Sequence, residues 1–274
     1  MQTDHTMAIR GKRIWISWLG GENPKIGPQE LTLKLQQKGF QTYGSDWIND
    51  NAKLAWADLG NTLADQEEID LWLICVDESS LQSTDIRFGL SLCATIIRES
   101  RGFQFPIYLL GLGFEPGQED LPLLLKDVVC FTSNTPSWDA KILSSTYRKS
   151  KSEAPPYRVS VRANSSFGLW FELGPREGSW DGIMAGVDQM DGIKITHHAV
   201  GPKGVLPEKA TMEYPIQGIV AEAGDDSFTL WAAKNHLGED QSYYFKVEGQ
   251  PSKLMFGAYP GSSQEMDMQV INLR

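Results

Sequence analysis

The sequence predicts two parts of different fold class: an α/β doubly wound, flavodoxin-like domain over residues 11–149 and an all-β sandwich or barrel over residues 157–274. In the first part, apolar strand-like runs alternate with helix-like segments, which is the pattern of a sheet covered by helices on both sides. In the second part, short strand-like segments follow one another between Gly, Pro, Asn and Asp turns, which is typical of antiparallel folds. The polar segment 149–156 ends in two prolines and is the predicted linker.

Five strands and four main helices are predicted in the first part. The strands cover residues 13–18, 40–43, 71–76, 105–113 and 128–131, and the helices cover about 28–39, 54–64, 83–97 and 138–148. Pro28 suits the first turn of a helix. The run 71–76 is continuously apolar, so it is expected to be a central strand buried on both faces.

The stretch 71–97 organises this part, because it predicts a strand, a loop and a helix in succession. Apolar residues at three- and four-residue spacing form one helix face: Ile86, Leu90, Cys93, Ala94 and Ile97. Thr84 and Asp85 are candidate N-caps, and Glu99 is expected to be solvated. The loop lies at the carboxyl edge of the predicted sheet, where open α/β sheets bind ligands.

Nine strands are predicted in the second part. They cover residues 157–163, 169–173, 182–187, 194–200, 213–223, 228–233, 243–247, 254–259 and 267–273. Pro215 indicates an edge strand or the start of a strand. Such an edge can recruit another chain by strand addition, or it can be an ordinary bulge.

Composition excludes several functions. The net charge of −10 is spread over both halves of the 274 residues, which argues against a general nucleic-acid binder. The N-terminus has no apolar signal-peptide region, and no run is long enough to span a membrane. Cys75, Cys93 and Cys130 lie in apolar segments and match neither a metal site nor a disulfide framework, so a cytoplasmic location is expected.

Two aromatic features of the second part are candidate sites. Neighbouring side chains on a strand point to opposite faces, so His197 and His198 are not expected to bind one metal ion, and no metal site is predicted. Trp170, Trp180 and Trp231 are candidates for a sugar or peptide groove, with packing in the core as the alternative.

Several features in order carry a resemblance over residues 11–149. The strand 14–18 (IWISW) is similar to an "F-I-S-Y" strand, and 40–43 is followed by a loop with Asp46 and Trp47. Trp56 and Leu59 precede the strand 71–76, which is followed by Ser83 and a helix, similar to an "S-x-x-W-C-x-x-E-L" region. This segment resembles a Toll/interleukin-1 receptor (TIR) domain.

The resemblance implies either an enzyme or an adaptor. Enzymatic TIR domains cleave the nicotinamide–ribose bond of NAD with a helical glutamate, whose carboxylate stabilises an oxocarbenium-like step. That position falls at Gly89 or Leu90 here, and neither side chain can supply the chemistry. Asp85 is a candidate substitute, against its simpler role as an N-cap.

A nucleotide pocket is also implied if the family's site is retained. Its residues would be Ser17, Trp18, Asp46, Trp47 and Ser83.

The favoured expectation is a TIR-like signalling or interaction protein of a prokaryotic defence or signalling system, with no cofactor. Its α/β half would assemble with other TIR-like domains or with itself, and its β half would sense or dock an unknown ligand or protein. The first alternative is an NAD-hydrolysing TIR enzyme regulated by the β half, with NAD as substrate or ligand. The second is a carbohydrate- or peptide-binding module on an α/β scaffold.

Overall fold

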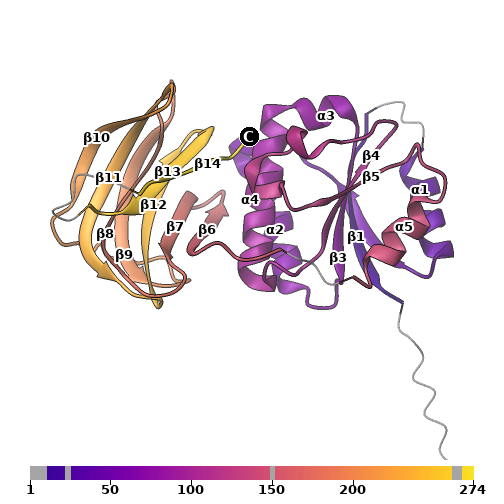
Figure 1. The fold of residues 1–274 in the computed structure, drawn as a ribbon, viewed down its shortest axis with the longest axis horizontal. Coiled ribbons are helices and arrows are strands. Elements are labelled where there is room, and N and C mark those ends of the chain that lie inside the picture. Colours follow the sequence, from indigo (N-terminus) through magenta and orange to yellow (C-terminus); the bar gives the residue numbers. More distant parts are fainter. Residues whose placement is uncertain (1–10, 22–25, 149–151, 261–266) are drawn as a thin grey trace, which may run out of the picture.

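The computed structural model describes residues 11–21, 26–148, 152–260 and 267–274 of the 274-residue chain. A parallel sheet with helices (the α/β part, 11–148) lies beside a pair of antiparallel sheets (the β part, 157–274), as Figure 1 shows. The predicted fold class is confirmed. Residues 149–151 of the predicted linker lie outside the described residues.

The α/β part contains a parallel sheet with the strand order β2-β1-β3-β4-β5. Its strands are β1 (Arg13–Leu19), β2 (Gln41–Asp46), β3 (Leu71–Val76), β4 (Ile107–Gly111) and β5 (Val129–Thr132). Its helices are α1 (Pro28–Gln37), η1 (Asn51–Lys53), α2 (Ala55–Asp65), α3 (Glu78–Gln82), α4 (Thr84–Arg101), η2 (Gln118–Asp120), η3 (Leu123–Leu125) and α5 (Trp138–Ser145). Every residue of β3 is buried, as its apolar run predicts.

Helices cover both faces of this sheet. On one face Ile16 and Leu73 share an apolar cluster with Leu31 of α1 and Ile142 of α5. On the other face the strand residues Trp72 and Ile74 pack with side chains of α2 and α4. The α/β part is therefore doubly wound, because alternate strand residues point to opposite helix layers.

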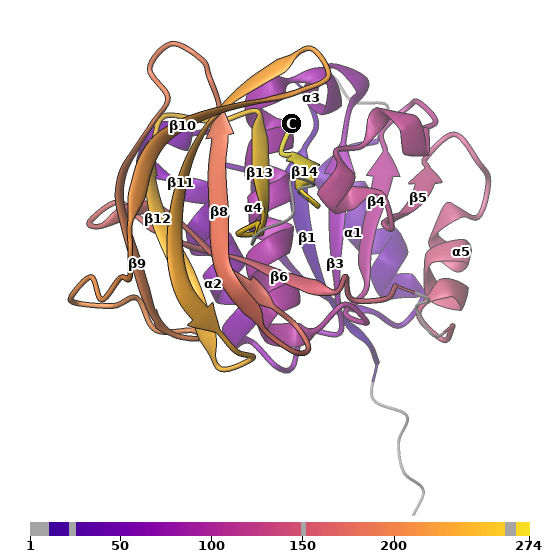
Figure 2. The ribbon, with the colours of Figure 1, turned by 60° about the vertical axis from the view of Figure 1, so that its left-hand side comes forward.

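The β part is a sandwich of two sheets. Its strands are β6 (Tyr157–Asn164), β7 (Gly168–Pro175), β8 (Trp180–Asp188), β9 (Lys194–Pro202), β10 (Ile216–Ala223), β11 (Asp226–Leu237), β12 (Gln241–Glu248), β13 (Lys253–Ala258) and β14 (Gln269–Asn272). The sheets have the orders β10-β11-β8-β13-β14 and β6-β7-β12-β9, seen from a second side in Figure 2. Phe171 of β7 and Phe245 of β12 are cross-strand neighbours in the second sheet, and their rings stack with centroids 5.4 Å apart. Pro215 directly precedes the edge strand β10, as predicted.

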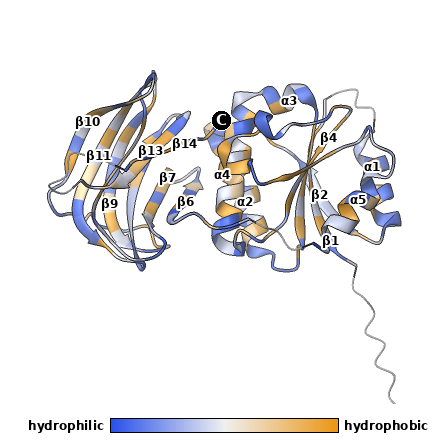
Figure 3. Ribbon diagram, in the orientation of Figure 1, coloured by the Kyte–Doolittle hydropathy of each residue, from blue (hydrophilic) through white to orange (hydrophobic). Residues whose placement is uncertain are grey.

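Helix α4 joins the two parts. Every residue from Phe88 to Arg98 is buried, which is the environment of a helix enclosed on all sides. Helices α2 and α4 lie between the parallel sheet and the sandwich, with α4 beside β6 (Figure 1). One apolar cluster runs from Trp56 and Phe88 into the sandwich residues Phe171 and Phe256, and apolar residues mark this helix in Figure 3. The two parts therefore share a continuous core.

Two local predictions were wrong. Helix α4 begins at Thr84 with Ser83 at the N-cap position and without a side-chain cap, so Thr84 and Asp85 belong to its first turn. The predicted loop after β3 contains a short helix, α3, capped by Asp77, whose carboxylate accepts the Ser80 N–H at 2.7 Å. Its five residues are too few for a periodic apolar pattern to reveal it.

The prediction that Glu99 is solvated was also wrong. Its side chain is 21% exposed and forms an ion pair with Arg162 of β6. No helix in the described ranges is long and apolar enough to cross a membrane.

Candidate functional site

The residues of the predicted nucleotide pocket have different surroundings. Trp18 and Asp46 line one concavity of about 700 Å³ beside β1, β2 and α1. Ser17 is fully buried, and its Oγ accepts the Trp72 Nε1–H at 2.9 Å. Ser83 occupies the N-cap position of α4. The structure therefore brings Trp18 and Asp46 together, whereas Ser17 is engaged in the core.

The two positions that the resemblance assigns to a catalytic glutamate are enclosed. A Cβ atom at Gly89 would lie 2.9 Å from the Trp47 ring and 3.3 Å from Trp56 Cδ1. Leu90 has no exposed surface. Trp47 thus packs against the helix at the position where a catalytic side chain would start.

Asp85 is exposed at the first turn of α4. Its main-chain oxygen accepts the Asn51 Nδ2–H at 3.0 Å. Asn51 also donates to Gln250 Oε1 at 2.9 Å, which links the α/β part to the β part at this end of the helix. The Asp85 carboxylate is therefore exposed to solvent, close to a contact between the two parts.

At the carboxyl edge of the sheet, the Gly20-Gly21 turn is closed by the chain itself. The Gly21 N–H donates to the Asp77 carboxylate at 2.5 Å. Burial opposes ionisation of Asp77, but hydrogen bonds from Ser80, Ser79 and Gly21 outweigh it and hold its pKa below the ordinary value. The Asp77 carboxylate therefore already accepts the Gly21 N–H, which is the donor that an anionic ligand would need.

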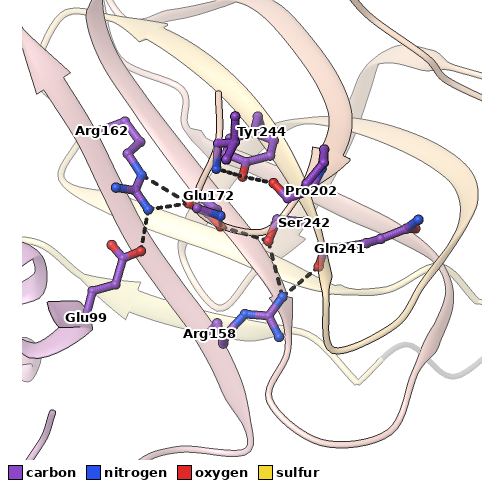
Figure 4. Close-up of polar contacts among 10 residues, drawn as sticks. Glu99, Arg158, Arg162, Glu172, Pro202, Gln241, Ser242 and Tyr244 are labelled. Carbon is purple, nitrogen blue, oxygen red and sulfur yellow. Dashed lines mark hydrogen bonds and ion pairs between the residues drawn. The ribbon is translucent and has the colours of Figure 1, made fainter. Parts of the chain in front are cut away.

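A polar network connects α4 with the β part (Figure 4). Arg162 donates to Glu99 Oε1 at 2.5 Å and to Glu172 Oε2 at 3.1 Å. Glu172 is 1% exposed and also accepts hydrogen bonds from Ser242 Oγ (2.9 Å) and the Gly204 N–H (2.8 Å). Burial disfavours the charge of Arg162, but the two carboxylates outweigh it and raise its pKa. Burial raises the pKa of Glu99, and the charge of Glu172 raises it further, whereas the nearby Arg162 acts in the opposite direction without cancelling these effects.

Arg158 extends this network towards a cavity. Its guanidinium contacts only uncharged acceptors, namely the main-chain oxygens of Pro175 and Gln241 and Oγ of Ser242. Burial lowers its pKa. The cavity measures about 480 Å³, lies between α4, η3 and β6, and also includes Arg98 in its lining. Sequence reasoning missed it, and the only signals were arginines within apolar segments.

The histidine and tryptophan candidates do not form a common site. His198 is buried against the Trp231 ring at 4.7 Å, and burial lowers its pKa to about 4. His197 points to the opposite face, 6.2 Å from Trp170. Trp180 pairs with Leu237 at the start of β8, five residues along the strand from Ala185, which pairs with Trp231. In the described ranges, no group of three or more His, Cys, Asp or Glu side chains could hold a metal ion.

Comparisons with known proteins were limited. No family model and no curated protein matches the chain. Among solved structures, ChBD3 of Thermococcus kodakarensis KOD1 is similar over 41% of this chain and 88% of its own, with 13% identity and a TM-score of 0.22. ChBD2 of the same organism is similar over 41% and 90%, with 11% identity and a TM-score of 0.22. These values carry no argument about function.

Proposed function

We propose that the chain is a TIR-like signalling or interaction protein whose α/β part assembles with further copies of itself or with other TIR-like domains. The β part would dock or sense a partner. The observation that carries the proposal is the open outer edge of β2, the first strand in the order β2-β1-β3-β4-β5. That strand order is also the flavodoxin-like order expected of a TIR-like domain.

The edge of β2 is unprotected. All but one of its residues are exposed, and the strand Gln41–Asp46 contains no lysine, proline or bulge of the kind that blocks edge pairing; its one charged residue, Asp46, lies at its end. The N–H groups of Gln41 and Trp47 point towards β1, each in a 2.9 Å bond. The main-chain groups of the alternate residues Thr42, Gly44 and Asp46 therefore point outward. Two copies of this edge can pair antiparallel about a two-fold axis.

The enclosed catalytic position supports an interaction role over catalysis. A side chain at Gly89 would require Trp47 or the helix to shift, because its Cβ would lie 2.9 Å from the Trp47 ring, and Leu90 lies in the core. A carboxylate at either position would be held away from solvent and from a substrate.

The test is the oligomeric state of the full chain over a wide concentration range, measured by sedimentation velocity. Ser45→Lys adds a charge to the exposed β2 edge, and Val129→Lys adds the same charge to the opposite edge strand, β5, as the matched control. We expect the wild type and Val129→Lys to self-associate and Ser45→Lys to remain monomeric. Self-association that survives Ser45→Lys, or a wild type that stays monomeric and captures no TIR-like partner, would overturn the proposal.

The NAD-hydrolysing enzyme remains the second candidate, because Trp18 and Asp46 line one concavity of suitable size. Asp85 is the candidate carboxylate of such an enzyme, but it belongs to the first turn of α4 and lies outside the lining of this concavity. Release of nicotinamide by the wild type, and its loss in Asp85→Ala, would favour this candidate. No release at concentrations where the chain assembles would exclude it for the isolated protein.

A further inference from the structure

The cavity between the two parts has walls from both. Helix α4 contributes Arg98, residues 123, 124, 126 and 127 form a second wall, and β6 contributes Tyr157 and Arg158. At about 480 Å³, it falls within the range of pockets that hold small organic ligands. A molecule bound here would contact the α/β part and the β part together.

The lining carries an excess of positive charge. Its cations are Arg98, Lys126, Arg158, Arg176 and Lys203, and its carboxylates are Glu99, Asp127 and Glu153. Five cations face three carboxylates, although the whole chain has a net charge of −10. Two of these carboxylates are already paired, Asp127 with Arg98 and Glu99 with Arg162.

Two of the lining arginines make no direct ion pair within the described residues, although the carboxylates of Glu172 and Glu239 act on Arg158 from a longer distance. Arg158 is only 5% exposed, and its Nε has no hydrogen-bond partner. Arg176 donates to the main-chain oxygens of Pro155 (2.8 Å) and Tyr157 (3.3 Å). Across the described part of the chain, neither guanidinium forms an ion pair with a carboxylate. A buried cation is costly unless an anion compensates it, so this arrangement favours an anionic ligand.

The arginines are also held in place before any ligand arrives. Arg98 and Arg176 lie over the Phe103 ring, with their guanidinium carbons 5.7 and 5.4 Å from its centroid. Cation–π contacts and main-chain hydrogen bonds fix the planar guanidinium groups, which reduces the entropy lost on binding. Leu123 and Ile271 add apolar wall to the same cavity.

We propose that this cavity binds a small phosphate monoester with an apolar body. A phosphate monoester carries a charge of about −2 near neutral pH, which is opposite in sign to the excess of cations in the lining. Arginine forks match the oxygens of phosphate, and the apolar wall accepts the organic group. This inference concerns a ligand site distinct from the β2 edge, and it stands independently of the proposed assembly.

Isothermal titration of the full chain with phenyl phosphate tests the site, with inorganic phosphate and benzoate as comparisons. We expect phenyl phosphate to bind with a Kd of about 1 mM or lower and more tightly than either comparison. Lys203→Gln changes an exposed lining residue, and Lys34→Gln makes the same charge change on the far side of the parallel sheet. We expect about a fivefold loss of affinity in Lys203→Gln and no change in Lys34→Gln.

Arg158→Gln should weaken binding at least tenfold, provided that circular dichroism shows it to be folded; if it does not fold, the lysine pair alone decides. Absence of binding at millimolar phenyl phosphate would overturn the proposal. So would equal affinity for benzoate, which would indicate a general anion site, or affinity that is unchanged in Lys203→Gln. Sedimentation does not enter these readouts, so failure here is distinguishable from failure of the assembly proposal.

Discussion

Replacement of Gly89 by glutamate would place a carboxylate at the position that the TIR resemblance assigns to catalysis. The structure predicts a loss of stability instead. The new Cβ would lie 2.9 Å from the Trp47 ring and 3.3 Å from Trp56 Cδ1, and contacts below 3.0 Å require one of these groups to move. Both neighbours are bulky indole rings, and Trp56 is buried in the core.

The magnitude follows from three contributions. Overpacking of a tight site costs about 1–3 kcal/mol. A buried carboxylate whose pKa rises by two to three units costs about 3–4 kcal/mol at pH 7. Replacing glycine inside a helix raises the free energy of unfolding by about 1 kcal/mol, because glycine has a low helix propensity. We therefore expect Gly89→Glu to lower the free energy of unfolding by about 3–6 kcal/mol, and Gly89→Ala by about 0–2 kcal/mol.

Urea unfolding at pH 7, followed by tryptophan fluorescence and far-UV circular dichroism, measures these differences. Gly60→Ala is the matched control on α2, because its Cβ would lie 3.1 Å or more from the nearest atoms, all of Ile96, compared with 2.9 Å at Gly89. We expect Gly60→Ala to stay within about 1 kcal/mol of the wild type. A Gly89→Glu protein with wild-type stability and unchanged tryptophan emission would refute the reasoning, and nicotinamide release by it would show an open pocket.

Three further predictions concern buried polar groups. Burial lowers the pKa of His198 to about 4 and holds the side chain neutral in the folded protein. The wild type should therefore lose up to roughly 3 kcal/mol of its free energy of unfolding as the pH falls from 6.5 to 4. His198→Gln should lack this loss. Glu172→Gln should lower the free energy of unfolding by about 3–5 kcal/mol, because it leaves Arg162 without its buried partner. The control Glu177→Gln changes an exposed side chain and should have no effect. Urea titrations of both variants measure the difference. Burial raises the pKa of all three thiols, that of Cys130 to about 11, so Ellman's reagent at pH 8 should label the folded chain slowly and all three thiols rapidly in denaturant.

Much of the fold could be predicted because its signals are local. The continuous apolar run of β3 and the short strands between turns of the β part each occupy a few consecutive residues. Strand and helix periodicity depends on neighbours along the chain, so these elements are visible without a partner. The resemblance likewise indicated residues near the carboxyl edge of the sheet, of which Trp18 and Asp46 share a concavity.

The rest required tertiary contacts. The apolar stripe of α4 predicts one buried face, but the sandwich encloses the other face as well, which is why Glu99 pairs with Arg162 rather than with water. No local sequence pattern predicts that contact, because its two residues are 63 positions apart.

The sequence by itself determined the two fold classes, the order of most elements and the absence of a carboxylate at positions 89 and 90. Only the tertiary structure decided that Gly89 is closed by Trp47, and that Arg98 and Arg158 line one cavity between the two parts. The physical reason is that secondary structure follows from short-range periodicity. A cavity and its charge balance depend instead on how distant segments pack.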